Sequence, residues 1–96
     1  MNVNKIVDII QKNRDFLSSQ YNVKDIGIFG SVRRGQEKKT SDVDILVEFS
    51  KPVGMFKFID LEKYLSILIG KKVDLVTKKA LKPAIKEEIL QEVIYA

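Results

Sequence analysis

The sequence predicts an α/β fold in which helices pack on a small sheet of about three strands. Three observations lead to this prediction. Apolar patterns of helical and strand period alternate along the chain, in the order helix, strand, short helical turn, strand, helix, strand, helix. The length of 96 residues is that of one domain, so we expect a single domain over residues 1–96. The composition, with 45% apolar and 31% charged residues, is typical of a globular protein.

The first half of the chain is predicted to contain one helix and two strands. Apolar residues recur at helical spacing over residues 3–19, and a β-rich run over 24–29 ends at Gly30. The polar stretch 31–40 predicts a turn, one helical turn and a loop. Residues 43–49 alternate as a strand does, with Val43, Ile45, Val47 and Phe49 on one face and Asp42, Asp44, Leu46 and Glu48 on the other.

The second half is predicted to contain two helices and one strand. The first of these helices is indicated by apolar residues at helical spacing, Phe58, Leu61, Leu65, Leu68 and Ile69, and ends at Gly70. A strand follows over 72–77, and Pro83 begins a last helix whose predicted apolar face is Ile85, Ile89, Leu90 and Val93. We expect Met55, Phe56 and Phe58 to lie in the core, with an interface as the alternative.

Missing residue types exclude several kinds of chemistry. The chain has no cysteine and no histidine, which excludes disulfide scaffolds, thiolate or histidine-bound zinc, and any catalytic triad built on histidine. The net charge of +4 is modest, and no long basic block suggests nucleic-acid binding. No apolar run is long enough to span a membrane, and the polar N-terminus does not resemble a signal peptide, so we expect a cytoplasmic protein.

Candidate chemical groups concentrate on the two strands that carry aspartates. Asp42 and Asp44 are two residues apart on one strand, so their side chains share a face about 6.6–6.8 Å apart at the backbone. Asp74 lies on the later strand between apolar neighbours. Carboxylate oxygens so placed can hold Mg²⁺ or Mn²⁺, although Asp-x-Asp alone more often marks the polar face of a half-buried strand.

The turn after the first strand supplies candidate phosphate ligands. Gly30 ends the strand and Ser31 begins a helical turn, which places backbone N–H groups and a hydroxyl together. Arg33 and Arg34 follow and suit phosphate binding. Taken alone, Gly-Ser is an ordinary turn.

Taken together, these motifs resemble those of the nucleotidyltransferase fold shared by DNA polymerase beta, and most closely those of the minimal nucleotidyltransferases (MNT). The resemblance covers nearly the whole chain, in IFGSVRRG (28–35), SDVDILVEF (41–49), FIDLEKYLSILIGKKVDLVT (58–77) and IKEEILQEVIYA (85–96). It implies a small mixed sheet of about three to four strands and metal-dependent transfer of a nucleotidyl group from ATP or another nucleoside triphosphate.

The resemblance also implies a role for each candidate residue. Asp42, Asp44 and Asp74 are the implied catalytic and metal-binding residues, holding two Mg²⁺ or Mn²⁺ ions, and Asp74 could accept the proton of the attacking hydroxyl. Gly30 and Ser31 would position the β- and γ-phosphates. Arg34, rather than Arg33, would neutralise the charge on pyrophosphate. We expect the three carboxylates to converge near Ser31.

The resemblance implies a partner as well. MNT proteins of this size are often paired with a HEPN-domain toxin, which they neutralise by adenylylation in the studied pairs. Nothing follows the last predicted helix, so we expect a partner chain or a second copy of this chain to supply the acceptor site. Two further readings remain open: a nucleotide-binding module that neutralises its partner sterically, and a nucleic-acid-binding domain suggested only by the basic charge.

Overall fold

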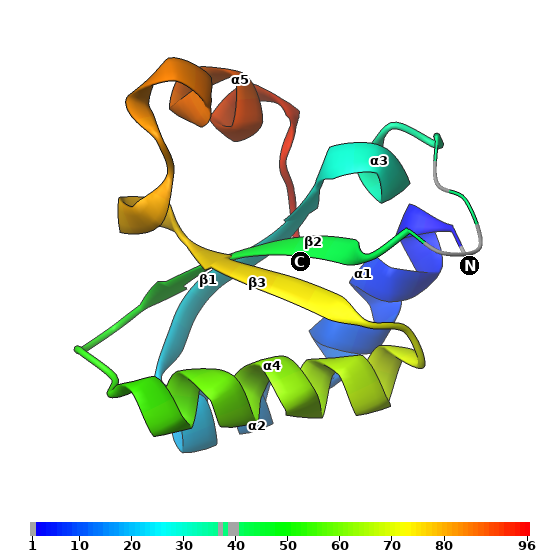
Figure 1. Ribbon diagram of the computed structural model, residues 1–96. Helices are drawn as coiled ribbons and strands as arrows, with labels where there is room; N and C mark the ends of the chain where they lie inside the picture. Colours follow the sequence, from blue (N-terminus) through cyan, green and yellow to red (C-terminus); the bar gives the residue numbers. More distant parts are fainter. Residues whose placement is uncertain (1, 37, 39–40) are drawn as a thin grey trace.

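The computed structural model describes residues 2–36, 38 and 41–96. The elements alternate along the chain as the apolar periodicity predicts (Figure 1). In chain order they are α1 (Val3–Lys12), α2 (Arg14–Tyr21), β1 (Val23–Phe29), α3 (Gly30–Arg33), β2 (Val43–Phe49), α4 (Met55–Ile69), β3 (Val73–Thr77), the 3₁₀ turn η1 (Lys78–Ala80), α5 (Pro83–Glu92) and β4 (Ile94–Tyr95).

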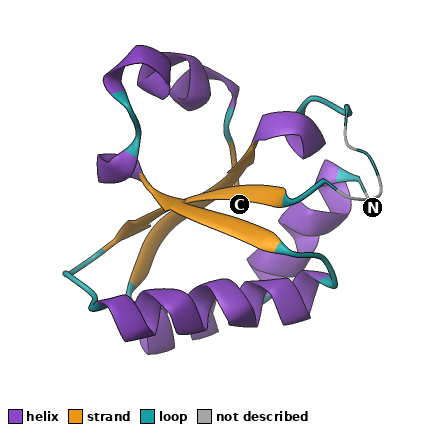
Figure 2. Ribbon diagram, in the orientation of Figure 1, coloured by secondary structure: helices purple, strands orange, loops and turns teal. Residues whose placement is uncertain are grey.

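The four strands form one mixed sheet in the order β3-β2-β1-β4. Figure 2 shows the strands between two groups of helices. β1 pairs antiparallel with β2 and with β4, whereas β2 and β3 run parallel. The mixed α/β fold predicted from the sequence is therefore confirmed. A parallel pair needs a crossover, and α4 makes it between β2 and β3.

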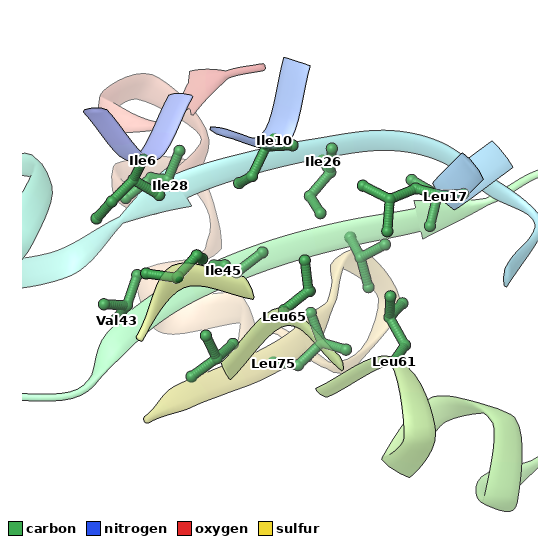
Figure 3. Close-up of a cluster of buried hydrophobic side chains, with 14 of the residues drawn as sticks. Ile6, Ile10, Leu17, Ile26, Ile28, Val43, Ile45, Leu61, Leu65 and Leu75 are labelled. Carbon is green, nitrogen blue, oxygen red and sulfur yellow. The ribbon is translucent and has the colours of Figure 1, made fainter. Parts of the chain in front are cut away.

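Helices cover both faces of the sheet, and the strand alternation decides which residues face them. Val43, Ile45 and Val47 of β2 lie in the main core, between the sheet and the layer of α1, α2 and α4. Figure 3 shows this core, with Ile6, Ile10 and Leu17 from the first two helices and Leu61 and Leu65 from α4 meeting the strand side chains. On the opposite face a smaller cluster of Phe29, Leu46 and Leu81 packs against Ile89, Leu90 and Val93. Asp44 lies two residues before Leu46 on β2, so its side chain is on the same face of the sheet, the face that α5 covers.

The single helix predicted over residues 3–19 is two helices in the structure. The break falls at Asn13, which ends α1 and begins α2. Its side-chain amide donates to the carbonyl oxygen of Ile9 at 2.8 Å. Asparagine competes in this way with the helical backbone, which is why the pattern of apolar residues continues while the helix does not.

Three further expectations are wrong in part. Met55 and Phe56 are 75% and 86% exposed, and of the three expected core residues only Phe58 packs against the core. Ile85 is 44% exposed, so the apolar face of α5 begins at Ile89. The strand β4 is absent from the sequence prediction, because two strand residues directly after a helix look like its continuation. Within the described ranges, no helix has the length and apolar character needed to cross a membrane.

Candidate active site

The parallel pairing of β2 and β3 brings two of the predicted carboxylates to neighbouring positions. Asp44 is the register partner of Asp74, and both strands begin at this end of the sheet. Asp74 is exposed and Asp44 is half-buried. Asp42 precedes β2 by one residue and lies close enough to Asp44 for its charge to act on that carboxyl. Apolar residues on either side of Asp44 and of Asp74 enter the main core, which directs these two carboxylates to the opposite face.

The turn after β1 packs directly against Asp44. Phe29, the last residue of β1, pairs with Asp44, and Gly30 follows with φ of +78°. A Cβ atom on Gly30 would overlap the carboxylate of Asp44 and would lie 2.9 Å from its Cγ. Only glycine therefore satisfies both the left-handed backbone and the close approach of the carboxylate. Ser31, the next residue, is half-buried in α3.

The electrostatics of the site centre on Asp44. Burial raises the pKa of its carboxyl, and the negative charges of Asp74 and Asp42 raise it further, while Arg34 acts in the opposite direction. The ammonium of Lys72 lies 3.9 Å from a carboxylate oxygen of Asp42. The carboxylates of Asp74 and Asp42 therefore lie close enough to Asp44 to oppose its ionisation, an arrangement that a cation would relieve.

The donor set suits a hard divalent cation. It consists of carboxylate oxygens, which Mg²⁺ and Mn²⁺ prefer, and the mutual repulsion around Asp44 is the kind that such an ion removes. Among the residues that the structure describes, however, no group of three acidic side chains lies close enough to hold one ion jointly. The register aligns Asp44 with Asp74, whereas joint binding of an ion by all three aspartates stays a prediction.

Besides acting on Asp44, Arg34 pairs with a second acidic residue, Glu92. Its Nη1 atom contacts both carboxylate oxygens of Glu92 at 3.1 Å, and its Nε donates to Gln36 at 3.3 Å. Oε1 of Glu92 also accepts a hydrogen bond of 2.9 Å from the N–H of Gly30. That bond and the Arg34 contacts lower the pKa of the Glu92 carboxyl, although burial alone would raise it.

Glu92 is the site residue that sequence reasoning missed. It lies 62 residues after Gly30 and one helical turn after Glu88, so in the sequence it looks like another solvent-facing acid. Its side chain is only 21% exposed in the structure. The single sequence carries no local signal that would separate Glu92 from its neighbours, because the contact depends on how α5 packs.

A hollow at the other end of β2 and β3 is unrelated to the aspartates. It measures about 760 Å³ and lies beyond Phe49 and Thr77, with Phe58, Lys79 and Lys86 in its wall. None of the predicted site residues lines it. The candidate active site is therefore recognised by its carboxylates and its glycine turn, not by the depth of a cavity.

Comparison with known proteins finds relatives that match nearly the whole chain. The model of the Nucleotidyltransferase domain family matches residues 10–96. Protein adenylyltransferase MntA of Thermococcus cleftensis is 43% identical over 95 residues, covering 99% of this chain and 96% of the relative. A structure assigned provisionally as a minimal nucleotidyltransferase superposes with a TM-score of 0.81 at 29% identity, covering 98% of this chain and 95% of that one.

A second solved structure shares the fold at lower identity. It contains a tri-AMPylated HEPN toxin of Shewanella oneidensis in complex with an MNT antitoxin, and the match has a TM-score of 0.60 at 20% identity, over 98% of this chain and 67% of that chain. The family resemblance inferred from the Gly-Ser turn and the three aspartates is confirmed. The chain belongs to the Nucleotidyltransferase domain family and is a nucleotidyltransferase related to protein adenylyltransferase MntA.

Proposed function

We propose that this chain transfers AMP from ATP to a hydroxyl of a HEPN-domain partner and thereby acts as the antitoxin of a pair. The relatives support the class of reaction, since MntA is a protein adenylyltransferase and an MNT antitoxin of the same fold is found with an AMPylated HEPN toxin. The observation that carries the proposal is the alignment of Asp44 with Asp74 beside the glycine turn.

In the proposed step, the acceptor oxygen attacks the α-phosphorus of ATP. A new P–O bond forms, the bond to the oxygen bridging the α- and β-phosphates breaks, and pyrophosphate leaves. The proton of the acceptor hydroxyl passes to a carboxylate. Asp74 is the proposed proton acceptor, because it is exposed at the start of β3 and can approach a partner protein.

The turn after β1 is proposed to bind the triphosphate. Gly30 and Ser31 would position the β- and γ-phosphates, and the guanidinium of Arg34 would offset the charge that develops on pyrophosphate. Arg34 has five N–H donors, and its contacts with Glu92 and Gln36 use Nη1 and Nε. Its side chain is 47% exposed, so it can approach a ligand from the solvent side.

Asp42, Asp44 and Asp74 are the proposed ligands of two Mg²⁺ or Mn²⁺ ions. When bound, the ions would neutralise phosphate charge and lower the pKa of the attacking hydroxyl. The carboxylates themselves orient the site, because their strands fix the face from which they approach the triphosphate. The repulsion of Asp44 by the negative charges of Asp74 and Asp42 supports this assignment.

The experiment separates enzymatic from steric neutralisation. The chain is co-expressed with its HEPN-domain partner, and rescue of growth is measured beside labelling of the partner by ATP that carries the label on its α-phosphate. We compare the wild type, Asp44→Asn and the control Asp60→Asn, an exposed aspartate on α4.

We expect Asp44→Asn to lower labelling by a factor of hundreds or more and to lose rescue, because a metal contact made in the transition state is worth several kcal/mol. Asp60→Asn should behave as the wild type. Rescue by Asp44→Asn without labelling would refute adenylylation as the biological function and favour a nucleotide-binding module that acts sterically.

A further inference from the structure

One residue of the C-terminal segment holds the turn of the candidate active site at three points. The carboxylate of Glu92 accepts the N–H of Gly30 at 2.9 Å and pairs with Nη1 of Arg34 at 3.1 Å. The backbone carbonyl of Glu92 accepts a hydrogen bond of 2.7 Å from Nε of Arg33. Glu92 therefore contacts both ends of α3, the short helix that follows β1.

The chain around Glu92 is fixed to the strand that precedes this turn. β4 pairs with β1 through Gly27 opposite Tyr95 and Ile28 opposite Ile94, and the N–H of Ala96 donates to the carbonyl of Ile26 at 2.9 Å. A Cβ atom on Gly27 would lie only 2.6 Å from the side chain of Val93. The backbone of Glu92 thus cannot move away from the turn without disturbing the pairing of β4.

The contacts of Glu92 and of Asp44 meet at the same glycine. Glu92 binds the N–H of Gly30, while the carboxylate of Asp44 occupies the space where a Cβ atom of Gly30 would stand. A hydrogen bond to an ionised carboxylate is stronger than one between neutral groups. Removing the charge of Glu92 therefore loosens the turn at the point where it touches Asp44.

We propose that Glu92 is a positioning residue for nucleotide transfer, which holds the Gly30–Arg34 turn in register with the aspartates of β2 and β3. Glu92 acts through Gly30 and Arg34 and does not itself contact the reacting atoms. This inference rests on the proposed function, because it concerns how the same site binds its triphosphate. The packing of α5 and β4 then helps to set the position of the Gly30–Arg34 turn in the site.

The test compares Glu92→Gln with Glu88→Gln in the full chain. Glutamine keeps the shape of the side chain and removes its charge, and Glu88 is an exposed acid one helical turn earlier on α5. We measure KM for ATP and kcat for labelling of the HEPN-domain partner, Mn²⁺ binding without nucleotide, and the amide proton shift of Gly30 by NMR.

We expect Glu92→Gln to raise the KM for ATP about tenfold, the size of effect that about 1.4 kcal/mol produces. The decrease in kcat should be smaller, and Mn²⁺ binding should stay within about twofold of the wild type, because the carboxylates of β2 and β3 are untouched. The Gly30 amide proton should move upfield as the charged acceptor is lost, and Glu88→Gln should leave all four quantities unchanged. The KM of Glu92→Asp should lie between those of the wild type and Glu92→Gln, since aspartate keeps the charge on a shorter side chain.

Two results would overturn the inference while the proposed function stands. One is a wild-type KM in a folded Glu92→Gln variant. The other is a lower KM, which would mean that the carboxylate competes with the triphosphate for Gly30 and Arg34. If Glu92→Gln does not fold, Glu92→Asp decides by the same two criteria. A wild-type chain that neither binds ATP with Mg²⁺ nor labels the partner would refute the proposed function itself, and this inference with it.

Discussion

The close approach of Asp44 to Gly30 makes Gly30→Ala the sharpest probe of the site. Gly30 has φ of +78°, and a Cβ atom there would overlap the carboxylate of Asp44. Gly35 provides a matched control, since its φ is +70° and, among the residues that the structure describes, no atom beyond its chain neighbours lies within 4 Å of the position of its Cβ. Both alanine variants carry the backbone strain, and only Gly30→Ala adds the clash.

The two contributions can be estimated separately. An L-residue in the left-handed region costs about 1–2 kcal/mol, which is the whole expected loss in the free energy of unfolding for Gly35→Ala. Forcing extra atoms into a filled space costs about 1–3 kcal/mol more. Gly30→Ala should therefore lose about 2–5 kcal/mol, and its melting temperature should fall below that of Gly35→Ala by roughly 4 °C or more.

The clash is isolated by denaturant unfolding of a double-mutant cycle, which consists of the wild type, Gly30→Ala, Asp44→Ala and the variant with both substitutions. In the Asp44→Ala background the overlapping carboxylate is gone, so Gly30→Ala should cost about 1–3 kcal/mol less than it does in the wild type. Mn²⁺ binding should weaken at least about tenfold in Gly30→Ala and stay unchanged in Gly35→Ala, because only the former displaces Asp44 from its position opposite Asp74. Equal losses of stability for the two glycine variants, with no coupling to Asp44, would refute the proposed packing of this turn.

The remaining predictions concern charge and the C-terminal strand. Asp44→Asn should raise the melting temperature of the metal-free protein at neutral pH by a few degrees, since the surroundings of Asp44 oppose its charge; a lower melting temperature would contradict the electrostatic account. Calorimetry should show that ATP binds only with Mg²⁺ or Mn²⁺, and equal affinity without the ion would favour a simple basic pocket. Below pH 4.5 the wild type should lose the stabilisation that Glu92 provides, because its pKa is lowered on folding and the loss occurs as the pH falls through that lowered value. Asp44 acts in the opposite sense, since its raised pKa makes the metal-free protein less stable as the pH rises above 3.8 through the raised value. Melting temperatures measured against pH should lack the Glu92 effect in Glu92→Gln and the Asp44 effect in Asp44→Asn. Gly27→Ala should displace β4, because the new Cβ atom would meet the side chain of Val93 at 2.6 Å, and faster hydrogen exchange of the β4 amides would report it.

The sequence predicts the strand face of the site well because that information is local. Alternation along residues 43–49 assigns Val43 and Ile45 to one face and Asp44 to the other, and the structure confirms that Val43 and Ile45 are buried in the main core. The same argument places Asp74 correctly on a strand. What the alternation does not contain is the register of β2 against β3, which depends on how α4 crosses between them.

Predictions fail where one polar side chain overrides a periodic pattern or where an element is too short to have a period. Asn13 interrupts a helix whose apolar spacing continues, because its side chain binds the backbone of Ile9. β4 has two residues, fewer than the alternation of a strand needs to be visible. Met55 and Phe56 begin α4 but point to solvent, since a run of apolar residues does not say which part of a helix meets the sheet.

Glu92 shows why the candidate site could be predicted only in part. Each residue that the sequence identified lies in a short motif and owes its place to the strand or turn that contains it. Glu92 reaches Gly30 because α5 covers the second face of the sheet and β4 returns to the edge of β1. The same return puts the end of the chain beside the turn that the proposed reaction needs. Under the proposed function, binding of the triphosphate and the packing of the last helix share Gly30 and Arg34, so a change to either one should alter the other.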